Sequence, residues 1–113
     1  MTENKISIED LKKLELTVGK ILSAEKVPET DKLLLLSVDL GESTPRQIVS
    51  GISLYFPDCS VLVGKKCMFV ANLEPRVIRG IESNGMILAV STEEGLFSLL
   101  QPEDKIPAGT RAK

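Results

Sequence analysis

The sequence predicts an all-β domain built as a small closed barrel. Five short segments rich in β-branched and aliphatic residues are separated by glycine, proline, asparagine and aspartate turn signals, a pattern typical of such barrels. One connection, at residues 52–63, is longer and indicates a turn followed by a short helix between the third and fourth strands. At 113 residues the chain is long enough for one domain with its own core. The strand count also fits an SH3-like barrel or a sandwich, but the position of the helix favours a five-stranded OB fold.

The N-terminal part predicts a short helix that leads into a long first strand. Ser7 followed by acidic residues at positions 9 and 10 forms a capping pattern, so we expect a helix at about residues 7–13. Residues 14–27 are expected to form a strand, because apolar and polar residues alternate at its start. The alternation shifts after Gly19, which predicts a bulge or a tight bend there.

Four further strands and a tail complete the expected barrel. The clearest turn signal is Asn84-Gly85, because it stands directly before a short apolar run. The expected strands are residues 33–40, 46–49, 66–71 and 86–91, and a C-terminal β extension follows at 96–100. We expect the barrel to occupy about residues 14–92 of a single domain that spans residues 1–113.

The composition argues against catalysis and against a metal centre. The chain has no histidine, which removes the commonest general base. Its two cysteines, Cys59 and Cys67, cannot form a four-ligand zinc site, and Cys67 stands in an apolar run where a small core residue is expected. Neither a dinucleotide-binding glycine motif nor a P-loop occurs. We therefore expect a non-catalytic protein without a metal or another cofactor.

The hydropathy pattern gives an expectation about location. No apolar run approaches the roughly 20 residues that a membrane-spanning helix needs. The N-terminal segment is polar and lacks the apolar region of a signal peptide. We expect a cytoplasmic protein with no membrane partner.

The charge of the chain is acidic overall but unevenly distributed. A net charge of −2 and a pI near 5.2 argue against a generic nucleic-acid binder, which is normally basic. The segment 72–80, however, carries Arg76 and Arg79 with no acid between them. A loop held by rigid strands is where a small β-domain usually carries its binding groups. If nucleic acid binds here, so few cations predict modest affinity and a shallow salt dependence.

Short motifs that follow one another along the chain carry a resemblance to a known family. They are Val18-Gly19-Lys20-Ile21, Asp31-Lys32-Leu33, Val38-Asp39-Leu40-Gly41, Ile48-Val49-Ser50-Gly51, Asn72-Leu73-Glu74-Pro75-Arg76, Arg79-Gly80 and Ser83-Asn84-Gly85-Met86-Ile87-Leu88-Ala89. Each is weak alone, but their joint occurrence in this order and spacing is specific. From about Ile8 to Thr110 the chain resembles the tRNA-binding domain family, which includes free-standing tRNA-binding proteins and the C-terminal domain or β-subunit of methionyl-tRNA synthetases.

The resemblance implies an OB fold that recognises the shape of tRNA at its outer corner rather than a sequence. It also implies a homodimer, and it admits the catalytic subunit of methionyl-tRNA synthetase as a further partner, assisted in trans. The RNA-facing positions of the family correspond in this chain to Asn72, Arg76, Arg79, Ser83 and Met86, with Lys32 on the same face.

The chemistry of these residues suits RNA. Arg76 and Arg79 can form forked hydrogen bonds to phosphate oxygens, and Lys32 is either a further contact or a solvated turn lysine. The side chains at 72 and 83 supply neutral donors and acceptors for a 2′-hydroxyl or a base edge. Met86 is either an apolar surface for a base or a ribose, or the first core residue of its strand.

Two departures from the family pattern lower the expected affinity. The family commonly carries His-Pro-Asn-Ala-Asp-Lys-Leu-Tyr where this chain has residues 27–34, and Val77 stands where lysine is frequent. The chain also lacks the aromatics for an extended single-strand platform. The alternative function is that of a protein-interaction or export-related chaperone, which a smaller branch of the superfamily is thought to have. That branch lacks the Ser-x-Gly-Met motif present at residues 83–86.

The apolar residues at both ends predict the assembly. The tail at 96–100 follows the fifth strand, so its apolar side chains have no expected place in an already closed barrel, and Ile6, Ile8 and Leu11 pose the same problem. Exposing both sets would create a larger apolar patch than monomers usually carry. We therefore expect the N- and C-terminal extensions to form a dimer interface. The alternative is a tail that folds back over an open end of its own barrel.

Overall fold

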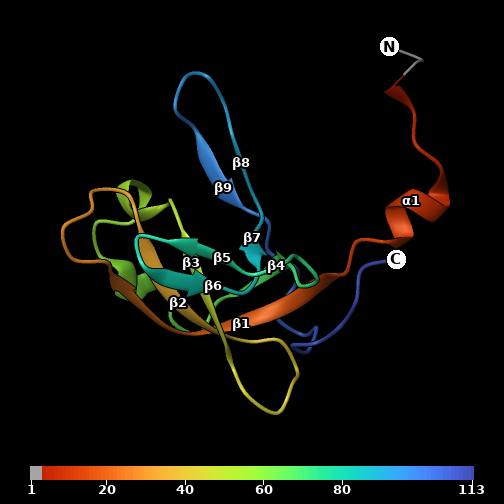
Figure 1. Cartoon of the computed structure of the whole chain (residues 1–113), viewed down its shortest axis with the longest axis horizontal. Helices are drawn as coiled ribbons and strands as arrows, with labels where there is room; N and C mark the ends of the chain where they lie inside the picture. The colour runs from red at the N-terminus through yellow and green to blue at the C-terminus, as the bar shows by residue number, and fades with distance from the viewer. Residues whose placement is uncertain (1–3) are drawn as a thin grey trace.

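The molecule is built around one five-stranded antiparallel sheet. In the computed structural model, which describes residues 4–113, the strands lie in the order β3-β2-β1-β4-β7 (Figure 1). Their bounds are Leu16–Lys26 for β1, Leu34–Asp39 for β2, Arg46–Ser50 for β3, Lys66–Val70 for β4 and Met86–Ile87 for β7. The first four of these lie within two residues of the predicted bounds.

Hydrogen bonds close this sheet into a barrel between β3 and the segment that precedes β7. The backbone N–H of Asn84 donates to the carbonyl of Gln47 at 2.8 Å. The buried hydroxyl of Ser83 accepts from the backbone N–H of Val49 at 2.9 Å. These bonds join the two edges of the sheet, so the predicted five-stranded OB-type barrel is confirmed.

The central strand β1 is bulged and tightly packed. Its register with β2 shifts between Ile21 and Ser23, two residues beyond the position predicted at Gly19. Gly19 has a different role, because a Cβ atom there would lie 2.7 Å from side-chain atoms of both Phe69 and Val38. The glycine therefore lets the core approach the backbone of β1, which explains the shift in the apolar pattern without a bulge at that residue.

One hydrophobic core fills the barrel. It includes the fully buried side chains of Ile21, Leu34, Leu36, Val38, Ile48, Leu62, Cys67 and Phe69. The burial of each large aliphatic side chain contributes about 1.5–3 kcal/mol. Cys67 is thus a core residue, as predicted, and burial raises the pKa of its thiol to about 11.

The turn and the short helix expected between the third and fourth strands are present, and both are of the 3₁₀ type. The connection contains two 3₁₀ turns, η2 at Ser53–Tyr55 and η3 at Cys59–Leu62. Pro57 lies between them, and the residue before a proline is disfavoured in the helical region, which prevents one continuous helix. The second turn is capped by Asp58, whose carboxylate accepts from the N–H of Ser60.

A hairpin occupies the segment that was expected to be a basic loop. Strands β5, Arg76–Ile78, and β6, Ile81–Ser83, pair with each other outside the main sheet. The turn residues Arg79 and Gly80 have φ values of 53° and 79°, the positive φ that both central residues of a type I′ turn require. The arginine is therefore presented at the tip of a rigid hairpin.

The predicted fifth strand is split in two. After β7, the chain leaves the barrel and continues as β8, Ala89–Ser91, which pairs with β9, Phe97–Leu99. The N–H of Leu88 still donates to the carbonyl of Met68 in β4 at 3.0 Å. After Leu88 the chain therefore stops pairing with β4 and pairs with β9. The β8–β9 hairpin projects from the barrel in Figure 1, and the predicted C-terminal β extension is confirmed.

The expectation that the whole tail lies outside the core is wrong. Leu99 is buried and packs in the core cluster, while Leu96 at the tip of the hairpin is 66% exposed. The barrel is still open at this end when the fifth strand is complete, because β7 has only two residues, and Leu99 fills the gap. The base of the tail therefore folds over its own barrel, as in the alternative, and only its tip projects.

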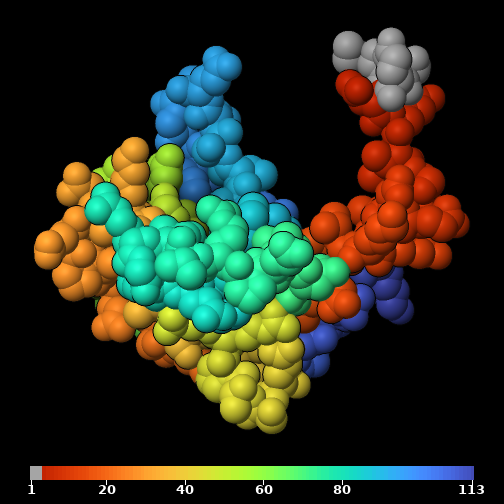
Figure 2. Space-filling view, in the orientation of Figure 1, coloured from red at the N-terminus to blue at the C-terminus, as the bar shows by residue number. Residues whose placement is uncertain are grey.

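The N-terminal segment forms an arm that stands away from the barrel (Figure 2). It contains helix α1, Ile8–Lys12, which begins as predicted at Ser7, whose hydroxyl accepts from the N–H of Asp10 at 3.1 Å. None of the residues of α1 is buried. In the part of the chain that the structure describes, no helix has the length and apolar character needed to span a bilayer.

Candidate nucleic-acid interface

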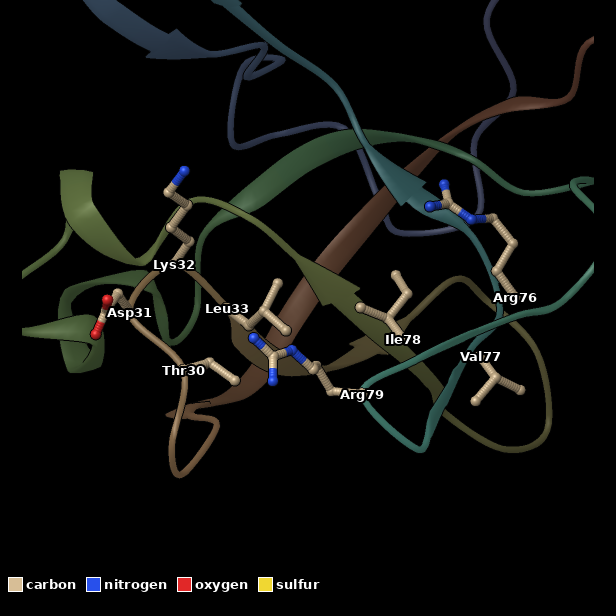
Figure 3. Close-up of a pocket in the computed structure, with 8 residues that line it drawn as sticks. All are labelled: Thr30, Asp31, Lys32, Leu33, Arg76, Val77, Ile78 and Arg79. Carbon is tan, nitrogen blue, oxygen red and sulfur yellow. The ribbon is translucent and has the colours of Figure 1, made fainter.

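A surface groove separates the β5–β6 hairpin from the segment before β2. Its volume is about 620 Å³. Figure 3 shows the residues that line it, which are Thr30, Asp31, Lys32, Leu33, Arg76, Val77, Ile78 and Arg79. The sequence prediction named three of these, Lys32, Arg76 and Arg79, and the fold brings them together across two segments that are distant in sequence.

Both walls of the groove are held by backbone hydrogen bonds. On one side, the carbonyl of Lys32 accepts from the N–H of Ser53 at 2.9 Å. The neighbouring Thr30 donates its hydroxyl to the carbonyl of Val27 at 2.8 Å. On the other side, the hairpin turn fixes Arg79. The cations are therefore carried on a rigid frame rather than on a mobile loop.

The electrostatics of the groove favour an anionic ligand. Within residues 4–113, neither arginine of the groove nor Lys32 takes part in an ion pair. The groove contains a single carboxylate, Asp31, and in Figure 3 it points away from Arg79 and from Arg76. Three cationic side chains with no ion-pair partner among residues 4–113 can each donate hydrogen bonds to phosphate oxygens.

The groove also has an apolar component that the residue-by-residue prediction missed. Leu33 and Ile78 are half-buried in it, and Val77 is 73% exposed at its side. Aliphatic surface next to cations suits a ribose or the face of a base beside its phosphate. The apolar pair Val77-Ile78 would have indicated this apolar surface only if the hairpin that carries it had been predicted, and it was not.

Two of the predicted RNA-facing residues have their polar groups engaged within the protein. The buried hydroxyl of Ser83 accepts from Val49 and donates to the carbonyl of Gly85 at 3.2 Å. The amide of Asn72 accepts from the N–H of Glu15 at 2.9 Å and donates to the carbonyl of Lys13 at 2.6 Å. Ser83 therefore stabilises the barrel seam, and Asn72 connects the N-terminal arm to the end of β4.

Met86 lies on β7 and is not among the residues that line the groove. Its side chain is 46% exposed, so the alternative that it is a core residue is wrong. The side chain is available on the surface for contact with a ligand.

Arg46 is a further arginine that was not singled out from the sequence. Its guanidinium group donates to both carboxylate oxygens of Glu42, at 2.9 and 2.8 Å, and to the carbonyls of Ala71 and Asn84. The hydrogen bond from Arg46 lowers the pKa of the Glu42 carboxyl. Arg46 uses its hydrogen-bond donors within the protein and thereby stabilises the barrel seam. It differs in this from the cations of the groove, which form no ion pair among residues 4–113.

Comparisons with known proteins identify the family to which the chain belongs. Residues 16–111 match the family described as "Putative tRNA binding domain". The chain is 51% identical over 108 residues to a methionine–tRNA ligase of Methanospirillum hungatei JF-1, and 41% identical over 107 residues to that of Enterococcus faecalis. These alignments cover 96% and 95% of the chain but only 16% of each ligase, so the chain spans a small part of these relatives.

Solved structures share the whole fold. A MetRS-related protein from Pyrococcus horikoshii superposes with a TM-score of 0.89 at 36% identity, covering 97% of this chain and 99% of that one. The chaperone CsaA from Bacillus anthracis str. Ames superposes with a TM-score of 0.84 at 28% identity, covering 96% and 99%. The resemblance found in the sequence motifs is thereby confirmed, and the chain belongs to the tRNA-binding domain family.

Proposed function

We propose that this chain is a non-catalytic module that binds folded tRNA through the groove between the β5–β6 hairpin and residues 30–33. The observation that carries the proposal is that Lys32, Arg76 and Arg79, which have no ion-pair partner among residues 4–113, all line one groove of about 620 Å³. Membership of the tRNA-binding domain family supports tRNA as the ligand.

The groove would recognise shape rather than sequence. The arginines contact phosphates, which position RNA without reading bases, and Lys32 adds a point charge on the opposite wall. With a net charge of −2, the rest of the molecule supplies little general attraction for nucleic acid. Binding therefore depends on phosphates that a folded RNA holds at the spacing of the rigid groove.

The similarity to methionine–tRNA ligases supports assistance to such an enzyme. In this arrangement the module holds the outer corner of tRNA while a synthetase catalytic subunit acts on it. The module contributes affinity by raising the local concentration of tRNA near the enzyme.

The proposal is tested by removing one cation at a time. We expect Arg76→Ala and Arg79→Ala each to weaken tRNA binding by about 1–2 kcal/mol, nearly equally for all tRNAs, and to reduce the salt slope by about 1. Lys105→Ala is the matched control, because Lys105 is an exposed lysine that does not line the groove. Filter binding across a salt series measures both quantities. Unchanged affinity in both arginine variants would refute the groove assignment.

A second candidate function rests on the structural similarity to CsaA. In this case the chain would bind unfolded polypeptide, and tRNA affinity would be incidental. The two functions are separated by competition, since a tRNA module should lose labelled tRNA to unlabelled tRNA far more readily than to poly-uridine or to a reduced, unfolded protein. Displacement by the unfolded protein at the lowest concentration would favour the chaperone function.

A further inference from the structure

An aromatic stack joins the 3₁₀ turn η2 to the β8–β9 hairpin. The ring of Tyr55 lies parallel to that of Phe97, with a centroid distance of 4.0 Å and an interplanar angle of 8°. Phe56 packs edge-on against the same ring at 5.9 Å and 80°. Tyr55 is 46% exposed although Phe97 covers one face of its ring. Tyr55 is therefore the outer layer of a preformed stack whose inner layers are held by the protein.

A hollow of about 340 Å³ opens beside this stack. Besides the aromatic residues, it is lined by Lys65, Ser98, Leu99 and Gln101, and no acidic residue contributes to it. In the described part of the chain, Lys65 forms no ion pair. A supported aromatic face, an ammonium group and an amide are the groups that bind a nucleotide through its base plane, its phosphate and its base edge.

The backbone connects this hollow to the groove. The N–H of Ser53, the first residue of η2, donates to the carbonyl of Lys32, and Tyr55 is the last residue of the same turn. Because Ser53 is buried, the position of Tyr55 relative to the wall of the groove is fixed. One RNA molecule can therefore meet two sites that the fold holds at a constant spacing.

We propose that Tyr55 and Lys65 form a second RNA contact, which binds one unpaired nucleotide of the RNA held in the groove. The base stacks on the open face of Tyr55, and Lys65 neutralises a flanking phosphate. This inference rests on the proposed function and adds a requirement for an unpaired nucleotide next to the folded part of the RNA.

The sequence offers an unusually direct probe, because Tyr55 is the only tyrosine and the chain has no tryptophan. Replacement of tyrosine by 3-fluorotyrosine gives a single ¹⁹F resonance that reports on this ring alone. We expect tRNA to shift this resonance, because a stacked base adds its ring current, and a blunt, fully paired RNA duplex to leave it in place.

Affinity measurements provide the second readout. Tyr55→Leu should weaken tRNA binding about tenfold, since stacking of one base is worth about 1–3 kcal/mol and 1.4 kcal/mol is tenfold. Tyr55→Phe keeps the ring and should bind within about twofold of the original chain. Lys65→Ala should weaken tRNA binding and reduce its salt slope by about 1, whereas Lys105→Ala should do neither.

The outcomes separate this inference from the proposed function. If the arginine variants of the groove weaken tRNA binding while the Tyr55 resonance stays fixed and Tyr55→Leu binds normally, the stack only anchors the hairpin and the inference is overturned. If the unmodified chain fails to bind tRNA, both the proposed function and this inference are wrong. Should Tyr55→Leu disturb the hairpin, the ¹⁹F resonance of fluorinated Tyr55 in the otherwise unchanged chain still decides.

Discussion

Ser83 illustrates how a single hydroxyl can hold the frame on which a binding site depends. It lies at the end of the hairpin that carries both arginines of the groove, and its oxygen satisfies the N–H of Val49 across the barrel seam. A buried N–H without a partner costs more than the bond itself contributes, because the group has lost its water. The residue therefore influences the groove without having to touch RNA.

We expect Ser83→Ala to lower the free energy of unfolding by about 1–3 kcal/mol, since it leaves the N–H of Val49 buried and unpaired. Urea unfolding followed by circular dichroism measures this. Ser98→Ala is the matched control, because Ser98 is exposed on β9 and its hydroxyl bonds only the adjacent carbonyl of Leu99. Equal stability of the two variants would show that the seam does not depend on this hydroxyl.

At the scale of single residues, the sequence predicted charge better than geometry. The two arginines of the groove were singled out because they lie in one short segment with no acid between them, and Lys32 was named through the resemblance to the family. The inward hydrogen bonds of Asn72 and Ser83 could not be foreseen, because their partners, Glu15 and Val49, lie far away in sequence. Whether these two polar residues also touch RNA stays a prediction.

Among the elements, β1 shows close packing between its backbone and the core at Gly19. It pairs with β2 on one side and β4 on the other, so the side chains of both neighbours converge over Gly19. A dense core does not readily move to admit even one methyl group.

Gly19→Ala should therefore destabilise the fold by about 1–3 kcal/mol through overpacking. Its Cβ would meet Phe69, Val38 and Leu40 at 2.7–2.8 Å. Gly51→Ala is the control, because a Cβ at Gly51 would have no atom within 4 Å. Thermal unfolding of both variants tests this, and a Gly19→Ala midpoint equal to that of the control would contradict it.

The accuracy of the predicted elements follows the length of their patterns. Strands β1 to β4, which each have five residues or more, carry apolar patterns long enough to be located within two residues. The β5–β6 hairpin was missed because each strand has only three residues and its turn is Arg79-Gly80 rather than the usual Asn-Gly. The split of the fifth strand depends on which strand lies beside Leu88, and local sequence does not contain that information.

At the scale of the whole molecule, two apolar projections leave the barrel. Ile8 is 57% exposed and Leu11 44% exposed on the N-terminal arm, while Val90 is 58% and Leu96 66% exposed on the β8–β9 hairpin. In Figure 2 the hairpin extends from the top of the barrel, and the arm leaves the barrel at the right and then turns upward. Pairing about a two-fold axis would cover these surfaces, so the homodimer remains our proposal.

The dimer is tested with Leu96→Asp, which should give a folded monomer by light scattering at micromolar concentration. The reason is that an unpaired charge at an apolar interface opposes association. Val61→Asp is the control, because Val61 is also about half exposed but lies on η3, away from both projections. Leu99→Asp is unsuitable as a test of the dimer, because Leu99 belongs to the core and a charge there would unfold the barrel. A monomeric mass for the unmodified chain would disprove the dimer.

The junction between the two ends of the chain has a consequence for the speed and order of folding. Thr17 pairs with Arg111 in an isolated bridge, and the carbonyl of Leu16 accepts from the N–H of Ala112 at 2.8 Å. The central strand is thus completed by residues that lie more than 90 positions further along the chain. Because contacts between distant residues must first close long loops, the rate of folding should fall in the slow range of β-barrels, milliseconds to seconds. On the ribosome, residues 16–18 of β1 must wait for residues 109–112 to leave the exit tunnel, and until then this part of the strand edge remains open to pairing with another chain.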